Sequence, residues 1–102
     1  MKMILTTFPS LASAEEVIGE LFQKKLIACA QIDGPVRSYY RWDGKLNDGE
    51  EWRVLLKTTA EKLEDLELET RRIHDYDTPQ WLVLDAKASV EYLKWVNESM
   101  VD

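Results

Sequence analysis

The sequence of 102 residues predicts an α+β fold of the ferredoxin-like class, in which a split βαβ arrangement builds one antiparallel sheet. Two observations lead to this prediction. β-favouring runs and helical apolar stripes alternate in the order strand, helix, strand, strand, helix, strand, followed by an added C-terminal helix. A long hairpin signal also lies in the middle of the chain. We therefore expect a single domain over residues 1–102, with an extended central hairpin and both main helices on one face of the sheet.

The N-terminal segment predicts a buried strand followed by a helix. A short apolar and β-branched run at residues 2–7 is stopped by Pro9. Ser13 and Glu16 have the spacing of a capping box, so we expect the helix to begin at Ser13 and to end near Lys24. The helical spacing of one apolar stripe supports this helix, and its members are Ala14, Val17, Ile18, Leu21 and Phe22.

The central segment predicts two long antiparallel strands. β-favouring residues dominate positions 27–42, and the Gly34-Pro35 pair predicts a break or bulge within that strand. Asp43-Gly44 is a strong hairpin signal. Clear alternation returns only at Trp52, so we expect residues 45–50 to belong to the connection. The tip of so long a hairpin should project beyond the domain and be covered by another subunit.

The C-terminal segment predicts a helix, a short strand and a last helix. Thr58 and Glu61 have the spacing of a second capping box, and the helix should run to about His74. The apolar run at residues 81–84 reads as a strand, and Ser89 opens the last helix. The acidic residues between 61 and 69 avoid the apolar stripe of their helix, which makes them a solvated face.

Charge and composition exclude several classes of function. With 13 basic and 19 acidic side chains the net charge is −6, and no basic stripe offsets it, so we expect no nucleic-acid partner. No apolar run is long enough to predict a membrane span. Cys29 is the only cysteine, which rules out an intrachain disulfide and favours a cytoplasmic location. Enzyme motifs such as a glycine-rich phosphate loop are missing, so we do not expect an enzyme.

His74, the only histidine, is the main candidate for binding a metal ion. Its imidazole lies close in sequence to the carboxylates of Asp75 and Asp77, and such ligands suit copper(II) or another divalent ion. A histidine near the end of a helix is also explained by a hydrogen bond to a last-turn carbonyl, and both readings stay open. Of these ligands we take His74 and Asp77 as the candidates, and Cys29 is a further candidate ligand, although its small neighbours favour core packing.

Several residues are candidates for a subunit interface or a cleft between subunits. The aromatic residues of the hairpin, including Tyr40, Trp42 and Trp52, have the character of interface residues because they combine large rings with polar atoms. Lys57 alternates with apolar positions, so its side chain points either into a cleft or into solvent. Tyr76 joins Lys57 and His74 in an alternative interpretation, an acid–base site in such a cleft.

Six segments in order also resemble the CutA family of divalent-cation tolerance proteins. This resemblance covers nearly the whole chain, and it implies a ferredoxin-like subunit in a homotrimer, a link to copper and other divalent metals, and no established catalytic reaction. Family members assigned a copper site have a cysteine and a second histidine where this chain has Thr6 and Ile73. An alternative from another class is a trimeric regulatory or scaffold module whose clefts bind a small molecule or protein, without a metal role. The matching segments are TFP (7–9), KLIACA (25–30), VRSYYRWDGK (36–45), LKT (56–58), HDYDTP (74–79) and YLKW (92–95).

Overall fold

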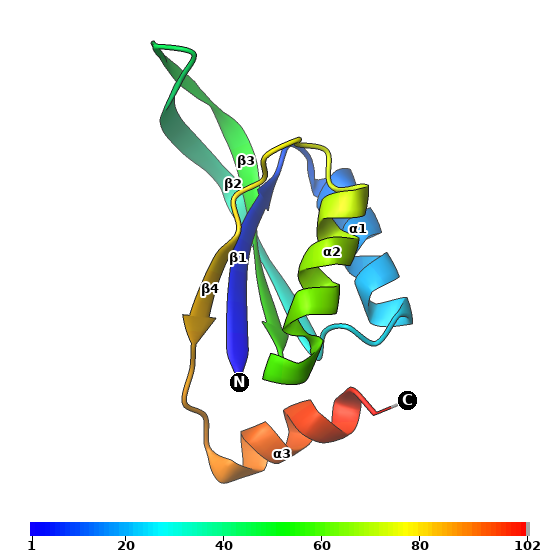
Figure 1. Ribbon diagram of the computed structural model, residues 1–102. Coiled ribbons are helices and arrows are strands. Elements are labelled where there is room, and N and C mark those ends of the chain that lie inside the picture. Colours follow the sequence, from blue (N-terminus) through cyan, green and yellow to red (C-terminus); the bar gives the residue numbers. More distant parts are fainter. Residues whose placement is uncertain (102) are drawn as a thin grey trace.

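The computed structural model describes residues 1–101 and confirms the predicted α+β fold (Figure 1). Within this range the strands form one antiparallel sheet in the order β2-β3-β1-β4, which is the ferredoxin-like order. The added C-terminal helix is present as expected. The elements are β1 (Lys2–Phe8), α1 (Leu11–Gln23), β2 (Cys29–Trp42), β3 (Lys45–Thr58), the 3₁₀ turn η1 (Ala60–Lys62), α2 (Leu63–Ile73), β4 (Leu82–Asp85) and α3 (Val90–Ser99).

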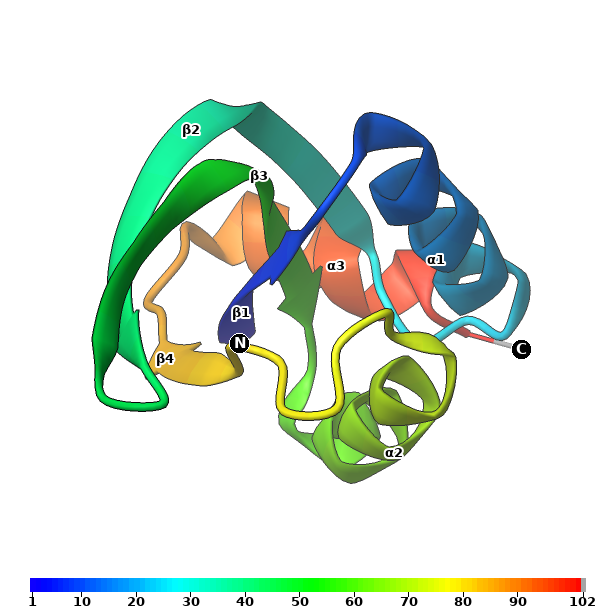
Figure 2. The same ribbon diagram turned by 90° about the horizontal axis from the view of Figure 1, so that it is seen from above.

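The core lies between the sheet and the two main helices. Helices α1 and α2 pack on the same face, as Figures 1 and 2 show, and α3 crosses the end of the sheet near the N-terminus. Alternate residues of β1 and β3 point into the core because side chains of a strand alternate between its two faces. The large side chains of this core with less than 2% exposure come from β1, β3, α1, α2 and the segment between α1 and β2: Ile4, Phe8, Leu21, Ile27, Val54, Leu56 and Leu66. Val96 of α3 is equally buried and belongs to a second, smaller cluster with Ala28 and Met100.

The opposite face of the sheet carries a group of apolar side chains, and within residues 1–101 no helix covers most of its length. Leu5 of β1 pairs with Leu55 of β3 on one side and with Leu82 of β4 on the other. These three leucines therefore form a row across the sheet, on the face away from α1 and α2. Leu82 is 51% exposed. We call this surface the open face, and define it by Met3, Leu5, Leu55, Leu82 and Leu84.

The central hairpin extends beyond the body of the subunit as an arm of residues 36–51 (Figure 1). Asp43 and Gly44 both have positive φ angles, 52° and 72°, as a two-residue type I′ turn requires. Strand pairing starts immediately at Trp42 and Lys45, so the expectation that residues 45–50 form a connection was wrong. In the arm both faces of the ribbon are largely exposed, and the second strand can form without apolar alternation.

A bulge marks the point where the arm leaves the sheet. The register of β2 against β3 shifts between Asp33 and Val36, which confirms the irregularity predicted at Gly34-Pro35. A Cβ atom on Gly34 would lie 3.1 Å from the carbonyl oxygen of Glu51 and 3.2 Å from the Cα of Trp52. The two strands approach closely here, and glycine is the residue that permits it.

The structure corrects the two predicted capping boxes. Helix α1 is capped by the hydroxyl of Ser10, which accepts a hydrogen bond from the backbone N–H of Ser13, so the helix begins one turn earlier than predicted. Thr58 is the buried last residue of β3, and its hydroxyl donates to the carbonyl of Leu26 instead of capping α2. The predicted cap at Ser89 is confirmed, because its hydroxyl accepts from the N–H of Tyr92.

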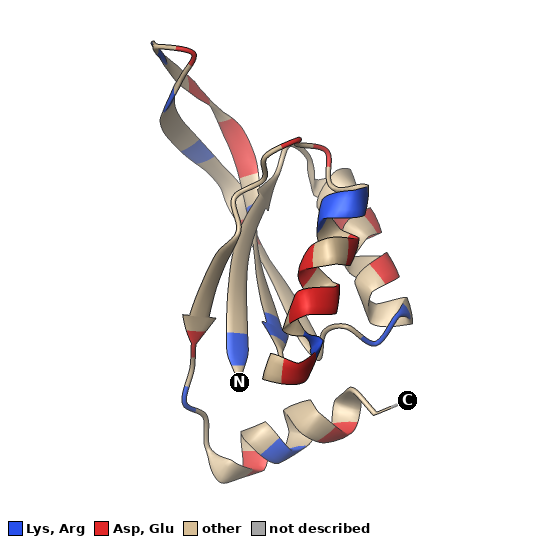
Figure 3. Ribbon diagram, viewed as in Figure 1, with Lys and Arg blue, Asp and Glu red and all other residues tan. Residues whose placement is uncertain are grey.

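The acidic charge of the chain is concentrated on the helical side of the molecule. Figure 3 shows Asp and Glu along the outer surfaces of α1 and α2. Leu66 is fully buried while Glu64 and Asp65 are exposed, which confirms that the acidic run forms a solvated face. Within residues 1–101 no helix is long and apolar enough to cross a membrane.

Candidate functional site

His74 lies at the end of α2, where the chain turns away from the helix in an extended conformation. Its Nδ1 accepts a hydrogen bond from the backbone N–H of Tyr76 at 3.0 Å, and its Nε2 lies 3.3 Å from the hydroxyl oxygen of Thr6. The ring stacks on that of Phe8, with centroids 4.3 Å apart and an angle of 17° between the planes. The side chain is therefore held on the core-facing side of β1.

These contacts indicate the tautomer of the neutral imidazole. Because Nδ1 accepts a hydrogen bond, the neutral ring carries its proton on Nε2 and donates it to Thr6. Burial lowers the pKa of His74 below its usual value, and the nearby carboxylates of Asp75 and Glu51 only partly oppose this effect. A metal ion would have to displace Thr6 to reach Nε2, since Nδ1 is already committed to the backbone.

A second contact ties the loop after α2 to the base of the arm. The hydroxyl of Tyr76 donates a hydrogen bond of 2.9 Å to the carboxylate of Glu51 in β3. Burial and the negative charge of Glu51 raise the pKa of the Tyr76 phenol well above its usual range. His74 and Tyr76 lie side by side, with ring centroids 5.3 Å apart. This loop therefore connects α2, β1 and β3.

The three candidate metal ligands do not meet within one subunit. Cys29 pairs with Lys57 in the sheet, which places it on the open face, whereas His74 contacts Thr6 and Phe8 on the core face. Cys29 is half-buried, not fully buried as core packing would require. Asp77 is exposed in the loop. No three His, Cys, Asp or Glu side chains within residues 1–101 are arranged to hold a metal ion.

Lys57 occupies a more defined place than the sequence indicated. Its ammonium group donates a hydrogen bond of 3.2 Å to the hydroxyl of Tyr92 in α3 and lies 5.3 Å from the centroid of that ring. Tyr92 in turn packs beside Trp95, with centroids 5.5 Å apart. Lys57 is therefore half-buried at the end of the open face, where α3 crosses the sheet.

The aromatic residues predicted for an interface fall into two groups. Tyr40 and Trp42 lie on the arm, and Trp42 is 66% exposed in the isolated subunit. Trp52 lies at the base of the arm, where it pairs with Phe8 and is half-buried. The arm thus presents large rings to solvent, while Trp52 belongs partly to the body of the subunit.

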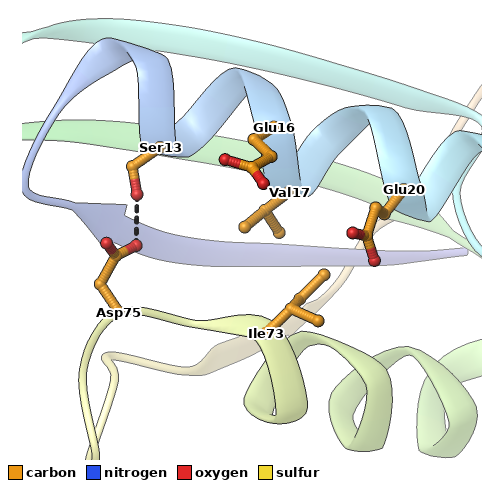
Figure 4. A pocket seen from close by; sticks show the side chains of 6 residues that line it. All are labelled: Ser13, Glu16, Val17, Glu20, Ile73 and Asp75. Carbon is orange, nitrogen blue, oxygen red and sulfur yellow. Dashed lines mark hydrogen bonds between the residues drawn. The ribbon is translucent and has the colours of Figure 1, made fainter.

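A small hollow between α1 and the loop after α2 is another place where acidic side chains gather (Figure 4). It is lined by Ser13, Glu16, Glu20 and Asp75 together with two apolar residues, and it has a volume of about 100 Å³. The hydroxyl of Ser13 donates to Asp75, so one carboxylate is already engaged. The hollow therefore offers no group of three carboxylates aimed at one point.

Sequence reasoning missed the partners that hold these side chains. Thr6, Glu51 and Tyr92 were not proposed as members of a site, although each lies far along the chain from the residue it contacts. Tyr92 carried a signal, because it belongs to the YLKW segment that resembles the CutA pattern. Thr6 was noted only as a departure from that pattern. Nothing in the sequence pointed to Glu51.

The fold and these contacts define a class of protein: a small ferredoxin-like subunit with an uncovered apolar sheet face, a projecting aromatic arm and no metal-binding cluster of its own within residues 1–101. The sequence profile of the CutA1 divalent ion tolerance proteins matches residues 2–99. This chain belongs to the CutA1 family.

Named relatives and solved structures agree with this assignment. A divalent-cation tolerance protein CutA of Thermotoga maritima is 36% identical over 102 residues, covering 99% of this chain and 100% of its own. The crystal structure of a D60A variant of CutA1 from Pyrococcus horikoshii superposes with a TM-score of 0.95 at 35% identity, covering all of both chains. A structure described as the periplasmic divalent cation tolerance protein CutA from Archaeoglobus fulgidus gives a TM-score of 0.93 at 33% identity, covering 99% of this chain and 100% of that one.

Proposed function

We propose that this protein acts as a non-catalytic homotrimer that binds copper(II) or another divalent metal ion. Membership of the divalent ion tolerance family supports the metal role, and the resemblance of its sequence to CutA proteins supports three copies. The single observation that carries the proposal is the open face, where leucines are exposed on a sheet that also bears an arm with exposed aromatic residues.

The open face and the arm have the properties of a surface between copies. Leu82 and Leu84 are about half exposed in the isolated subunit, and they belong to the edge strand β4, whose outer backbone groups are unpaired in the sheet. The arm exposes Tyr39 and Trp42 on the other edge of the same sheet. Contiguous exposed apolar surface is uncommon on monomeric proteins and typical of protein interfaces.

Two matched leucine variants test the oligomer. Leu82→Glu places a charge on the open face, whereas Leu68→Glu places the same charge on the outer surface of α2, where the leucine is 65% exposed. We expect light scattering to give the mass of three subunits for the wild type and for Leu68→Glu, and a smaller mass for Leu82→Glu. Wild-type protein of one-subunit mass at micromolar concentration would reject the trimer.

The proposed metal role uses His74 as the principal ligand, with Asp77 as the nearby carboxylate. The bond from Nε2 to Thr6 is the longer of the two ring contacts, at 3.3 Å, so we propose that a copper ion binds Nε2. The ring proton must then move from Nε2 to Nδ1, which breaks the hydrogen bond from the Tyr76 amide. Imidazole and carboxylate suit copper(II), which heads the order of divalent affinities. Residues 1–101 of one subunit do not assemble three such ligands, so we propose weak binding that water or a second subunit completes.

A calorimetric titration with copper(II) in a buffer of known copper affinity tests this role. We expect about one ion per subunit, and His74→Ala should weaken binding at least tenfold, about 1.4 kcal/mol. Asp77→Asn should weaken it less, and Asp43→Asn, at the tip of the arm, should leave it unchanged. Circular dichroism and light scattering show that each variant is folded and assembled. Equal affinity in His74→Ala would reject His74 as the ligand.

The second candidate function is a trimeric scaffold or regulatory module without a metal role. It is favoured by the separation of Cys29 from His74 and by Thr6 and Ile73 at the positions of the other family ligands. Copper binding that is weak, exceeds one ion per subunit and persists in His74→Ala would favour this candidate. The cytoplasmic location also stays a prediction, and fractionation of the source cells with an antibody would test it.

A further inference from the structure

We propose that Lys57 and Tyr92 form a binding site for a small oxyanion, a carboxylate or a phosphate, at the end of the open face. This site is distinct from the metal role proposed for His74, because it lies on the other face of the sheet and attracts the opposite charge.

Lys57 lies near the end of β3, on the open face of the sheet. It stands between the buried residues Leu56 and Thr58 of β3, so its side chain leaves the sheet on the open face. Its neighbours in the adjacent strands are Met3 and Cys29, neither of which carries a negative charge. The ammonium group is therefore half-buried among apolar and weakly polar side chains.

The two cations of the open face differ in whether a carboxylate neutralises them. The other cation of the open face, Arg53, already forms an ion pair with Asp33. Lys57 has no carboxylate within 4.0 Å in the part of the chain that the structure describes, although the protein carries a net charge of −6. A cation held away from bulk water without a counter-charge attracts an anion strongly, since the effective dielectric constant is low there.

Lys57 and Tyr92 also have hydrogen-bond donors that no acceptor within residues 1–101 uses. Lys57 uses one of its three N–H groups on the hydroxyl oxygen of Tyr92, which leaves two unused. Because that oxygen accepts from Lys57, the hydroxyl proton of Tyr92 is also available to an acceptor, and no partner for it is found within residues 1–101. The Nζ atom of Lys57 and the hydroxyl oxygen of Tyr92 lie 3.2 Å apart, so a single oxyanion placed beside this pair can accept a hydrogen bond from each of them. Charge-assisted bonds of this kind are the strong ones for carboxylate and phosphate.

The aromatic rings fix the geometry of this pair. Tyr92 packs on the cluster of Ala28, Val96 and Met100 and stands beside Trp95. The hydroxyl is thereby fixed at the end of a rigid ring, and Lys57 is held against the same ring at 5.3 Å. An oxyanion can come either from solution or from a carboxylate side chain of a second copy, since the open face is the surface we propose to be covered.

The test titrates the assembled, ¹⁵N-labelled protein with inorganic phosphate and with acetate at constant ionic strength, and follows the amide signals of Lys57 and Tyr92. We expect saturable shifts in the wild type, and at least tenfold weaker binding in Lys57→Gln. Lys57→Arg should keep binding within a few-fold. Tyr92→Phe, which keeps the ring and loses the hydroxyl, should weaken binding less than Lys57→Gln. Lys87→Gln is the matched control, because it removes the same charge from an exposed loop residue, and should not change binding.

Light scattering of the same variants separates the two sources of the oxyanion. Phosphate binding lost in Lys57→Gln at unchanged mass supports a free anion, whereas a mass lowered in Lys57→Gln but not in Lys87→Gln supports a carboxylate of a second copy. Shifts that are linear in phosphate, or equal in Lys57→Gln and Lys87→Gln, together with unchanged mass, would overturn the proposal. A monomer that binds phosphate through Lys57 would reject the proposed trimer and keep this site.

Discussion

Two buried threonines should respond in opposite directions to the same substitution. Thr58 and Thr70 both have no exposed surface. The hydroxyl of Thr58 donates a hydrogen bond of 2.8 Å to the carbonyl of Leu26, whereas the hydroxyl of Thr70 in α2 has no hydrogen-bond partner within residues 1–101. Valine keeps the β-branched shape and replaces the hydroxyl by a methyl group, so each change removes one polar group with little change in volume.

The magnitudes follow from what each hydroxyl leaves behind. Thr58→Val removes the donor and leaves the buried Leu26 carbonyl unpaired, which should lower the free energy of unfolding by about 1–3 kcal/mol. Thr70→Val removes a buried unpaired hydroxyl and should raise it by about 1 kcal/mol. Helix propensity differs little between threonine and valine, so it does not offset the gain. For a domain of this size, 1 kcal/mol corresponds to about 4–8 °C in Tm.

Urea unfolding followed by circular dichroism measures both effects. Wild type and variants should be compared at one protein concentration, because the proposed subunit association would add to the apparent stability. We expect the midpoint to fall for Thr58→Val and to rise for Thr70→Val, with unchanged slopes. A Thr70→Val protein that is less stable than wild type by as much as Thr58→Val would refute the assignment of its hydroxyl as unpaired.

Two further predictions concern the arm and the helical surface. Gly34→Ala should destabilise the base of the arm, because its Cβ meets the Glu51 carbonyl at 3.1 Å, and thermal unfolding should show a lower Tm than for Gly49→Ala, where nothing lies within 4 Å. Equal Tm values would show that the strands can move apart there. Hydrogen bonds and charge from Arg72 and Lys24 lower the pKa of Glu69 from 4.5 to about 2, so its stabilising effect is complete above pH 4.5 and is lost as the pH falls towards 2. Glu69→Gln should flatten this part of the curve of urea midpoint against pH, and an unchanged slope would contradict it.

The fold could be predicted from the sequence because its elements are encoded locally. The apolar stripe of α1, the Asp43-Gly44 turn and the cap at Ser89 each involve residues within a few positions of one another. The start of α1 was predicted wrongly because two nearby residues could each cap the helix. Ser10 and Ser13 are both capping residues, and the sequence does not show that Ser13 is bonded to Asp75, which lies 62 positions further on.

The candidate site was predicted less completely because its contacts are not local. The sequence identified His74, Tyr76 and Lys57 as polar groups in unusual positions, yet their partners lie 68, 25 and 35 positions away. Whether a histidine is free to bind a metal depends on what its two nitrogens contact. The hydrogen bond from the Tyr76 amide occupies Nδ1 of His74 and so reduces the ability of His74 to bind a metal ion. The order of residue types in the sequence does not reveal this hydrogen bond.

The proposed assembly would stabilise the arm of the subunit. A two-stranded hairpin is at best marginally stable on its own in water, and between residues 36 and 51 no side chain is fully buried in the isolated subunit. The contacts that hold it are cross-strand hydrogen bonds, the exposed Arg37–Asp48 ion pair and the bond from Tyr76 to Glu51 at its base. Exposed ion pairs contribute little, and the proposed trimer would stabilise the arm by burying Tyr39, Tyr40 and Trp42 against another chain. The loop that carries His74 shares its anchor, Glu51, with the arm, so in the proposed trimer a change in subunit contact should alter the surroundings of His74.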